Sequence, residues 1–135
     1  MKRLFAAIFI LTLLSATLQA QKKQARLLVY DFHNTIRCHT CATIEETMIE
    51  LLNTHYKEQL DSGIIVFKSF DCQAEENAEL VKKYSAYGST LVFTAFDNDG
   101  NEIINDVTDI AFSKIGKKEL FYEKMRKEID EMLEL

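Results

Sequence analysis

Two cysteines separated by two residues are the part of this sequence best suited to covalent chemistry. The motif Cys38-His39-Thr40-Cys41 follows a run of strand-forming residues and precedes a stretch with helical spacing. A cysteine in the first turn of a helix lies near unpaired backbone N–H groups and the positive end of the helix dipole, which favour a thiolate. Adjacent Arg37, and His39 when protonated, add to this effect. We therefore expect the pKa of Cys38 to lie below the value of about 8.5 for a free thiol.

A cysteine pair of this kind suits thiol–disulfide exchange. Cys38 would attack a partner disulfide, and Cys41 would resolve the mixed disulfide. Half of a zinc site or a structural disulfide has the same spacing. The sequence contains no second pair of this kind and no His-x-x-x-His pattern. The motif therefore favours redox chemistry, which needs no cofactor, over a zinc half-site.

The third cysteine, Cys72, makes the number of thiols odd and ends the second predicted strand. If that strand runs parallel to the first, Cys72 lies at the same sheet edge as the motif. It is then a third thiol for a disulfide relay or, with Cys38 and Cys41, a ligand for copper, zinc or arsenite. The alternative is a small side chain packed as a hydrophobe. We interpret His33, in the loop before the motif, as solvated.

The first twenty residues differ in character from the rest. The initial Met is followed by two basic residues, Lys2 and Arg3. Residues 4–14 are apolar apart from Thr12, and residues 15–20 are mostly small or polar. This pattern is typical of a secretory signal peptide cleaved after Ala20. A retained N-terminal anchor is the alternative, although the apolar run is short for a membrane span. We expect a periplasmic or otherwise exported domain over 21–135, in a compartment where disulfides persist.

Composition favours one compact domain. The chain has 135 residues, of which 47% are hydrophobic and 27% charged, with no Pro and a formal net charge of -5. These values argue against disorder, and the acidic charge argues against nucleic acid as the main partner. We expect a monomer that touches a membrane only through an uncleaved leader.

Hydrophobic periodicity predicts an α/β fold with the element order β-α-β-α-β-β-α. The predicted strands are 26–32, 64–70, 90–96 and 101–104, and the predicted helices are 41–60, 74–84 and 117–133. The first two strands should be parallel through a right-handed crossover, and the last two should form a hairpin. The nearly continuous apolar start of the second strand predicts cover on both faces. Helices would flank this central mixed sheet, and the cysteine motif would occupy a strand-to-helix turn.

The sequence resembles the thioredoxin-like superfamily over essentially all of 21–135. Tyr30-Asp31-Phe32 is similar to the family's strand that ends in Asp-Phe before the cysteine motif. Residues 83–93 resemble the family's tyrosine, short loop, cis-proline, threonine and aliphatic strand, and residues 97–102 resemble its following hairpin. Within the superfamily, the chain is most similar to small exported bacterial proteins known as nitrophenyl-compound nitroreductase subunits from arsenic-related gene clusters.

The resemblance implies a surface dithiol that exchanges with disulfides of partner proteins. It gives Asp31 the role of a buried acid that takes the proton from Cys41, and it places Ser89, Thr90 and His39 at the partner-binding surface. An acid of this kind works only if desolvation raises its pKa towards neutrality. The alternative for Asp31 is a carboxylate at the strand end that faces solvent.

Several positions depart from the family pattern. His-Thr stands between the cysteines in place of Gly-Pro, and no Trp precedes them. Ser89 stands where the family has its cis-proline, and a non-proline cis bond costs about 2.5–4 kcal/mol, so we expect a trans peptide there. Loss of the proline removes a rigid group that keeps metals from a dithiol. Besides exchange, two functions therefore stay open: a soft-ion carrier or sensor, and a non-catalytic redox-partner subunit with a structural disulfide.

Overall fold

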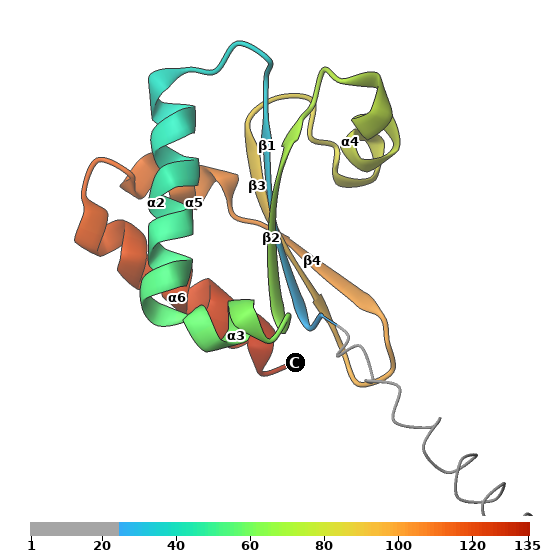
Figure 1. Cartoon of the computed structure of the whole chain (residues 1–135), viewed down its shortest axis with the longest axis vertical. Coiled ribbons are helices and arrows are strands. Elements are labelled where there is room, and N and C mark those ends of the chain that lie inside the picture. Colours follow the sequence, from blue (N-terminus) through green and yellow to red (C-terminus); the bar gives the residue numbers. More distant parts are fainter. Residues whose placement is uncertain (1–24) are drawn as a thin grey trace, which may run out of the picture.

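A four-stranded mixed sheet forms the centre of the computed structural model, which describes residues 25–135 (Figure 1). Its strands are β1 (Leu27–His33), β2 (Ile65–Asp71), β3 (Thr90–Phe96) and β4 (Glu102–Asp106). The strand order is β2-β1-β3-β4, in which β1 is parallel to β2 and antiparallel to β3, and β3 is antiparallel to β4. The predicted α/β class, parallel first pair and final hairpin are confirmed. The predicted leader, residues 1–20, lies outside the described residues.

Helices cover the two faces of this sheet unequally. The helical elements are α2 (His39–His55), α3 (Lys57–Asp61), the 3-10 turn η2 (Glu75–Asn77), α4 (Ala78–Tyr84), α5 (Thr108–Lys114) and α6 (Lys118–Leu133). Helices α2, α3, α5 and α6 lie on one face, and α4 lies on the other (Figure 1). None of the helices within 25–135 is long and apolar enough to cross a bilayer.

Two helical features differ from the prediction. The predicted helix 41–60 is broken at Tyr56, where the backbone leaves helical geometry with φ -132° and ψ 26°. The buried Tyr56 side chain donates a hydrogen bond of 2.6 Å to Asp130 of α6, so the break is fixed by a residue far along the chain. Helix α5 was not predicted, because Ala111 is its one buried residue and its apolar periodicity is weak.

The alternation of side chains along the strands divides the apolar residues into two clusters. The main cluster lies between the sheet and the larger helical layer, and its largest members include Phe93, Phe121, Met48, Leu51 and Met125. Leu27 and Val29 of β1 belong to it, so Asp31, two residues further along, points to the same side. The second cluster, under α4, contains Phe32, Val81, Tyr84, Ala86 and Val92.

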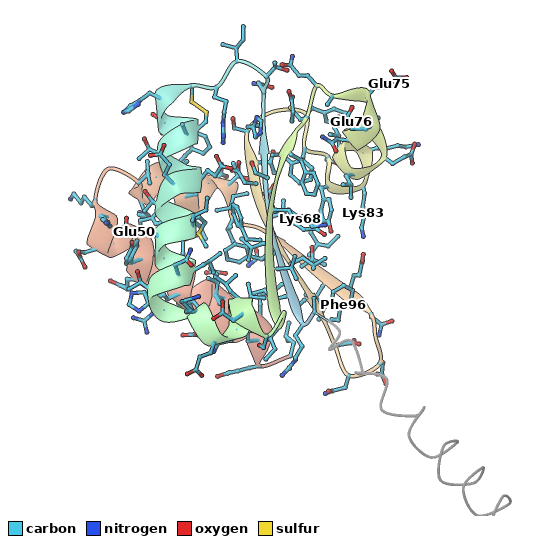
Figure 2. The ribbon with its side chains drawn as sticks, viewed as in Figure 1. Glu50, Lys68, Glu75, Glu76, Lys83 and Phe96 are labelled. Carbon is cyan, nitrogen blue, oxygen red and sulfur yellow. A yellow bond between two sulfur atoms is a disulfide. The ribbon has the colours of Figure 1, made fainter. Side chains whose placement is uncertain are left out.

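Strand β2 is an edge strand of the described sheet, and Ile65 is its one fully buried residue. Lys68 is exposed on the side of the sheet where α4 lies (Figure 2). The prediction that both faces of this strand are covered holds only in part, because Phe67 packs against the main apolar cluster and Phe70 against the second, whereas Lys68 is exposed. The physical reason is that α4 has seven residues and covers only part of this face.

Candidate active site

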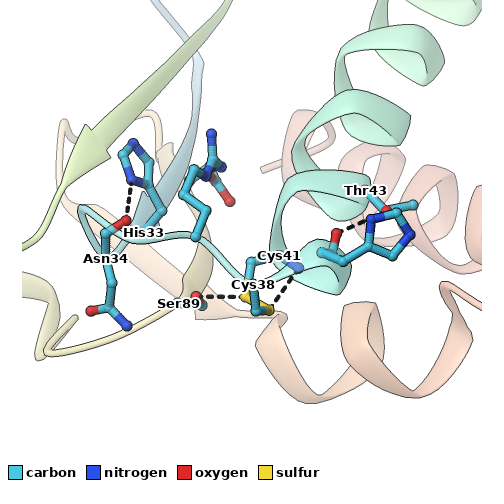
Figure 3. Close-up of a disulfide and its surroundings, with 9 residues drawn as sticks. His33, Asn34, Cys38, Cys41, Thr43 and Ser89 are labelled. Atoms are coloured by element: carbon cyan, nitrogen blue, oxygen red, sulfur yellow. Dashed lines mark hydrogen bonds and ion pairs between the residues drawn. A yellow bond between two sulfur atoms is a disulfide. The ribbon is translucent and has the colours of Figure 1, made fainter.

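Cys38 and Cys41 form a disulfide at the start of α2, with an S–S distance of 2.05 Å and a Cα–Cα distance of 5.1 Å (Figure 3). Cys38 is the N-cap residue of this helix, as predicted. The backbone N–H of Cys41 donates a hydrogen bond of 3.0 Å to the Cys38 sulfur. When the disulfide is reduced, the same N–H and the helix N-terminus favour a thiolate at Cys38.

The two cysteine residues differ in their exposure to solvent. Cys38 is exposed, whereas Cys41 is buried with 8% of its surface accessible. Cys41 lines a small pocket that is also lined by Asp31, Ile44, Ser89, Thr90, Leu91 and Phe112. An approaching thiol or disulfide therefore reaches Cys38 first, and Cys41 faces the interior of the site.

Ser89 and Thr90, two of the residues that the resemblance assigns to the partner-binding surface, line the same pocket as Cys41. The Ser89 hydroxyl donates a hydrogen bond of 3.1 Å to the Cys41 sulfur (Figure 3). The peptide bond before Ser89 is trans, since residues 25–135 contain no cis peptide. His39 is exposed and lines a different surface depression, beside Thr43, Ile115 and Gly116. The structure thus brings two of the three predicted partner-binding residues together in one pocket.

Asp31 is a buried acid, with 5% of its surface accessible. Its carboxylate accepts a hydrogen bond of 3.1 Å from the Ser69 hydroxyl and contacts Arg37 at 3.2 Å. Burial, followed by the negative charge of Glu45, raises the pKa of Asp31 from 3.8 to about 6, although Ser69, Arg37 and His33 oppose this. Of the two interpretations of Asp31, the solvent-facing carboxylate is therefore excluded.

Arg37 uses its guanidinium to join two carboxylates. One terminal nitrogen contacts Asp31, and the other forms an ion pair with Glu45 in the second turn of α2. Arg37 was predicted to stabilise the Cys38 thiolate, but these ion pairs direct its charge towards Asp31 and Glu45. Sequence reasoning did not identify Glu45. The available signal was its position four residues after Cys41, which puts both side chains on one side of the helix.

The loop that presents Cys38 is tied to the end of β2. The Thr35 hydroxyl donates a hydrogen bond of 2.7 Å to Asp71, and the Thr35 N–H donates one of 3.0 Å to the Gln73 side chain. The backbone N–H of Cys72 also donates to the His33 carbonyl at 2.8 Å. These bonds fix the course of residues 34–37 between β1 and the disulfide.

Cys72 lies on the α4 side of the sheet, where it packs against the second apolar cluster. Its thiol lies 3.2 Å from the Asn34 side-chain oxygen, to which it donates, and burial together with Asp71 raises its pKa. His33 is half-buried, and its Nδ1 lies 3.0 Å from the Asn34 carbonyl. In the part of the chain that the structure describes, no three His, Cys, Asp or Glu residues are grouped to hold a metal ion. Cys72 therefore packs as a small side chain and is not grouped with Cys38 and Cys41.

Comparison with known proteins does not assign a function. No protein-family model matches this sequence, and no curated protein matches it significantly. What the chain does must therefore be inferred from its own site.

Proposed function

We propose that this protein is a thioredoxin-like thiol–disulfide oxidoreductase that exchanges disulfides with partner proteins. One observation carries the proposal: the exposed residue Cys38 is disulfide-bonded to the buried residue Cys41, which lines a pocket with Asp31. A disulfide that only braces a fold needs neither the difference in exposure nor a buried carboxyl. Exchange needs both, because one sulfur must meet the partner and the other must lose a proton inside the site.

The arrangement of elements supports the thioredoxin-like part of this proposal. A strand leads to the cysteine motif at the start of a helix, and a parallel strand follows that helix. Ser89 precedes β3 and contacts the disulfide, in the place that the resemblance assigns to the loop before the third strand. An antiparallel β4 and a final helix complete the expected order, to which α3 and α5 are additions.

The reaction can be written so that bonds, electrons and protons balance. The Cys38 thiolate attacks a partner disulfide, a bond forms between Cys38 and one partner sulfur, and the second partner sulfur leaves as a thiolate. Cys41 then gives its proton to Asp31 and attacks Cys38. The Cys38–Cys41 bond forms, the bond to the partner breaks, and the first partner sulfur leaves as a thiolate. Two electrons pass from the dithiol to the partner, and the reverse sequence oxidises a partner dithiol.

Apolar side chains near the disulfide support a protein as the partner. Ile36, two residues before Cys38, is 89% exposed, and Tyr87, two residues before Ser89, is 75% exposed. Phe112 is 39% exposed and lines the same pocket as Cys41. Large apolar groups exposed around one reactive sulfur provide area that a partner protein can bury. Export to the periplasm is the proposed setting, based on residues 1–20.

The Cys41→Ser variant is expected to trap the partner. In the reduced variant, Cys38 still attacks a disulfide, but no resolving thiol follows, so a mixed disulfide accumulates. The measurement is non-reducing electrophoresis after addition of a disulfide-containing protein such as insulin, with mass spectrometry to locate the linked cysteine. We expect linkage at Cys38.

Cys72→Ser is the matched control, because it removes a thiol outside the pocket, and it should release the partner as the unmodified protein does. Linkage at Cys72, or equal trapping by the Cys38→Ser variant, contradicts the proposed roles.

A further inference from the structure

Arg37 lies between two carboxylates that come from different elements. Asp31 belongs to β1 and has a side chain that is 7% exposed, and Glu45 belongs to α2 and has a side chain that is 16% exposed. The guanidinium lies 3.2 Å from the Asp31 carboxylate and also pairs with Glu45. The cluster Asp31–Arg37–Glu45 is therefore a partly buried group of three charges, of which Asp31 lines the Cys41 pocket.

The charges of this cluster determine what Asp31 can do. An arginine paired with one carboxylate strongly favours the ionised form and makes it a poor proton acceptor. Here one positive charge serves two carboxylates, so the cluster has a net charge of -1 when both are ionised. It becomes neutral when Asp31 takes a proton. Burial favours the neutral state, since charge is costly away from water.

Glu45 stays ionised more readily than Asp31. Burial raises the pKa of Glu45, but the Ser69 and Arg37 side chains outweigh it and hold that pKa below its ordinary value. Burial and Glu45 raise the pKa of Asp31 to about 6. The two carboxyls of the cluster therefore take different roles, with Asp31 as the one that binds and releases a proton near neutral pH.

The other elements around Asp31 add little opposing charge. Strand β2 contributes the Ser69 hydroxyl, and His33 at the end of β1 exerts a weaker lowering effect on the pKa of Asp31 than Arg37 does. Leu91 and Phe112 line the pocket from β3 and α5 with apolar surface. The negative charge of Glu45 thus offsets the effect of the Arg37 positive charge on the pKa of Asp31.

We propose that Glu45 is a positioning residue that shares the Arg37 guanidinium with Asp31, which weakens the hold of Arg37 on the ionised Asp31 carboxylate and keeps Asp31 able to take the proton from Cys41. This inference rests on the proposed exchange function. In the step concerned, the Cys41 S–H bond breaks and the proton passes to the Asp31 carboxylate. The Cys41 sulfur bonds to Cys38, and the partner leaves as a thiolate. Asp31 then returns the proton to water.

Glu45→Gln tests the inference, because it keeps the side-chain size and removes the charge. Arg37 is then left with Asp31 alone, so Asp31 should titrate at a pH lower by about one unit. The readout is the carboxyl ¹³C NMR titration of Asp31 in the reduced, full-length protein. The pH profile of mixed-disulfide resolution should move in the same direction, with a lower maximal rate, because Asp31 becomes a weaker base.

Glu46→Gln is the matched control, since Glu46 is exposed and adjacent on the same helix, and it should leave both profiles in place. An unchanged Asp31 titration in folded Glu45→Gln protein overturns the inference. Arg37→Gln gives an independent test, in which the Asp31 midpoint must move to higher pH, and no movement also overturns it. If the unmodified protein exchanges no disulfide, the proposed function fails whatever these titrations show.

Discussion

Replacing Cys38 with serine is expected to abolish disulfide exchange, with a loss of about 10³-fold or more because the attacking nucleophile is removed. Cys41 cannot take over, because it is buried with 8% of its surface accessible. Cys72 cannot take over, because it lies with the second apolar cluster, away from the Cys41 pocket. The measurement is the rate at which the reduced protein reacts with oxidised glutathione, followed by mass spectrometry of the adducts.

Cys72→Ser serves as the control and should react at the rate of the unmodified protein. The Cys41→Ser variant should still form the first adduct. Equal behaviour of the Cys38→Ser and Cys41→Ser variants would show that the roles of attacking and resolving sulfur are assigned wrongly.

Replacing Asp31 with asparagine is expected to raise the free energy of unfolding at pH 8 by about 3 kcal/mol. The folded-state pKa of Asp31 is raised from 3.8 to about 6, first by burial and then by Glu45. The folded protein therefore binds this proton more tightly than the unfolded chain does. The stability that protonation of Asp31 contributes is fully present below pH 3.8 and is lost as the pH rises to about 6. Asparagine does not ionise, so the Asp31→Asn variant does not lose this stability as the pH rises.

Urea denaturation of the oxidised protein at pH 4 and pH 8 measures the effect. The difference between Asp31→Asn and the unmodified protein should be large at pH 8 and close to zero at pH 4. Asp109→Asn, at an exposed position in the first turn of α5, is the matched control. A variant that is less stable than the unmodified protein at pH 8 would contradict the account of Asp31.

The same substitution should slow the resolution of mixed disulfides by about 10²-fold, because Cys41 then lacks its proton acceptor. A gain in stability together with a loss in rate is the signature of a residue kept for chemistry rather than for folding. An Asp31→Asn variant that resolves mixed disulfides at the normal rate would remove Asp31 from the mechanism.

Sequence reasoning succeeded where local pattern decides the structure. The largely apolar run of residues 90–96 before the turn at 97–100 predicted β3, and the position of Cys38 between a strand and a helical pattern predicted its place at the N-terminus of α2. It failed where a distant contact decides, as at Tyr56, whose break in the helix depends on Asp130 of α6. Helix α5 carries too little apolar pattern to be predicted.

The candidate site shows the same division. Arg37 is next to Cys38 in sequence, but its charge is taken up by Asp31 and by Glu45, eight residues away. No local rule shows that one guanidinium will serve both carboxylates. The side of the sheet on which Cys72 lies could have been predicted from the sequence. Side chains alternate along a strand, so Cys72 lies on the face of Phe70, opposite to Ser69 and Asp31. Closeness along one sheet edge did not mean closeness on one face.

A glutathione redox titration tests the proposed exchange function most directly. The protein is equilibrated at a series of glutathione ratios, first alone and then with one equivalent of zinc, copper(I) or arsenite, and each cysteine is scored by alkylation and mass spectrometry. We predict that Cys38 and Cys41 are oxidised together, with a reduction potential well above about -300 mV, and that the ions change this little. A Cys38–Cys41 disulfide that resists reduction throughout, or three thiols protected together by one ion per chain, would contradict it.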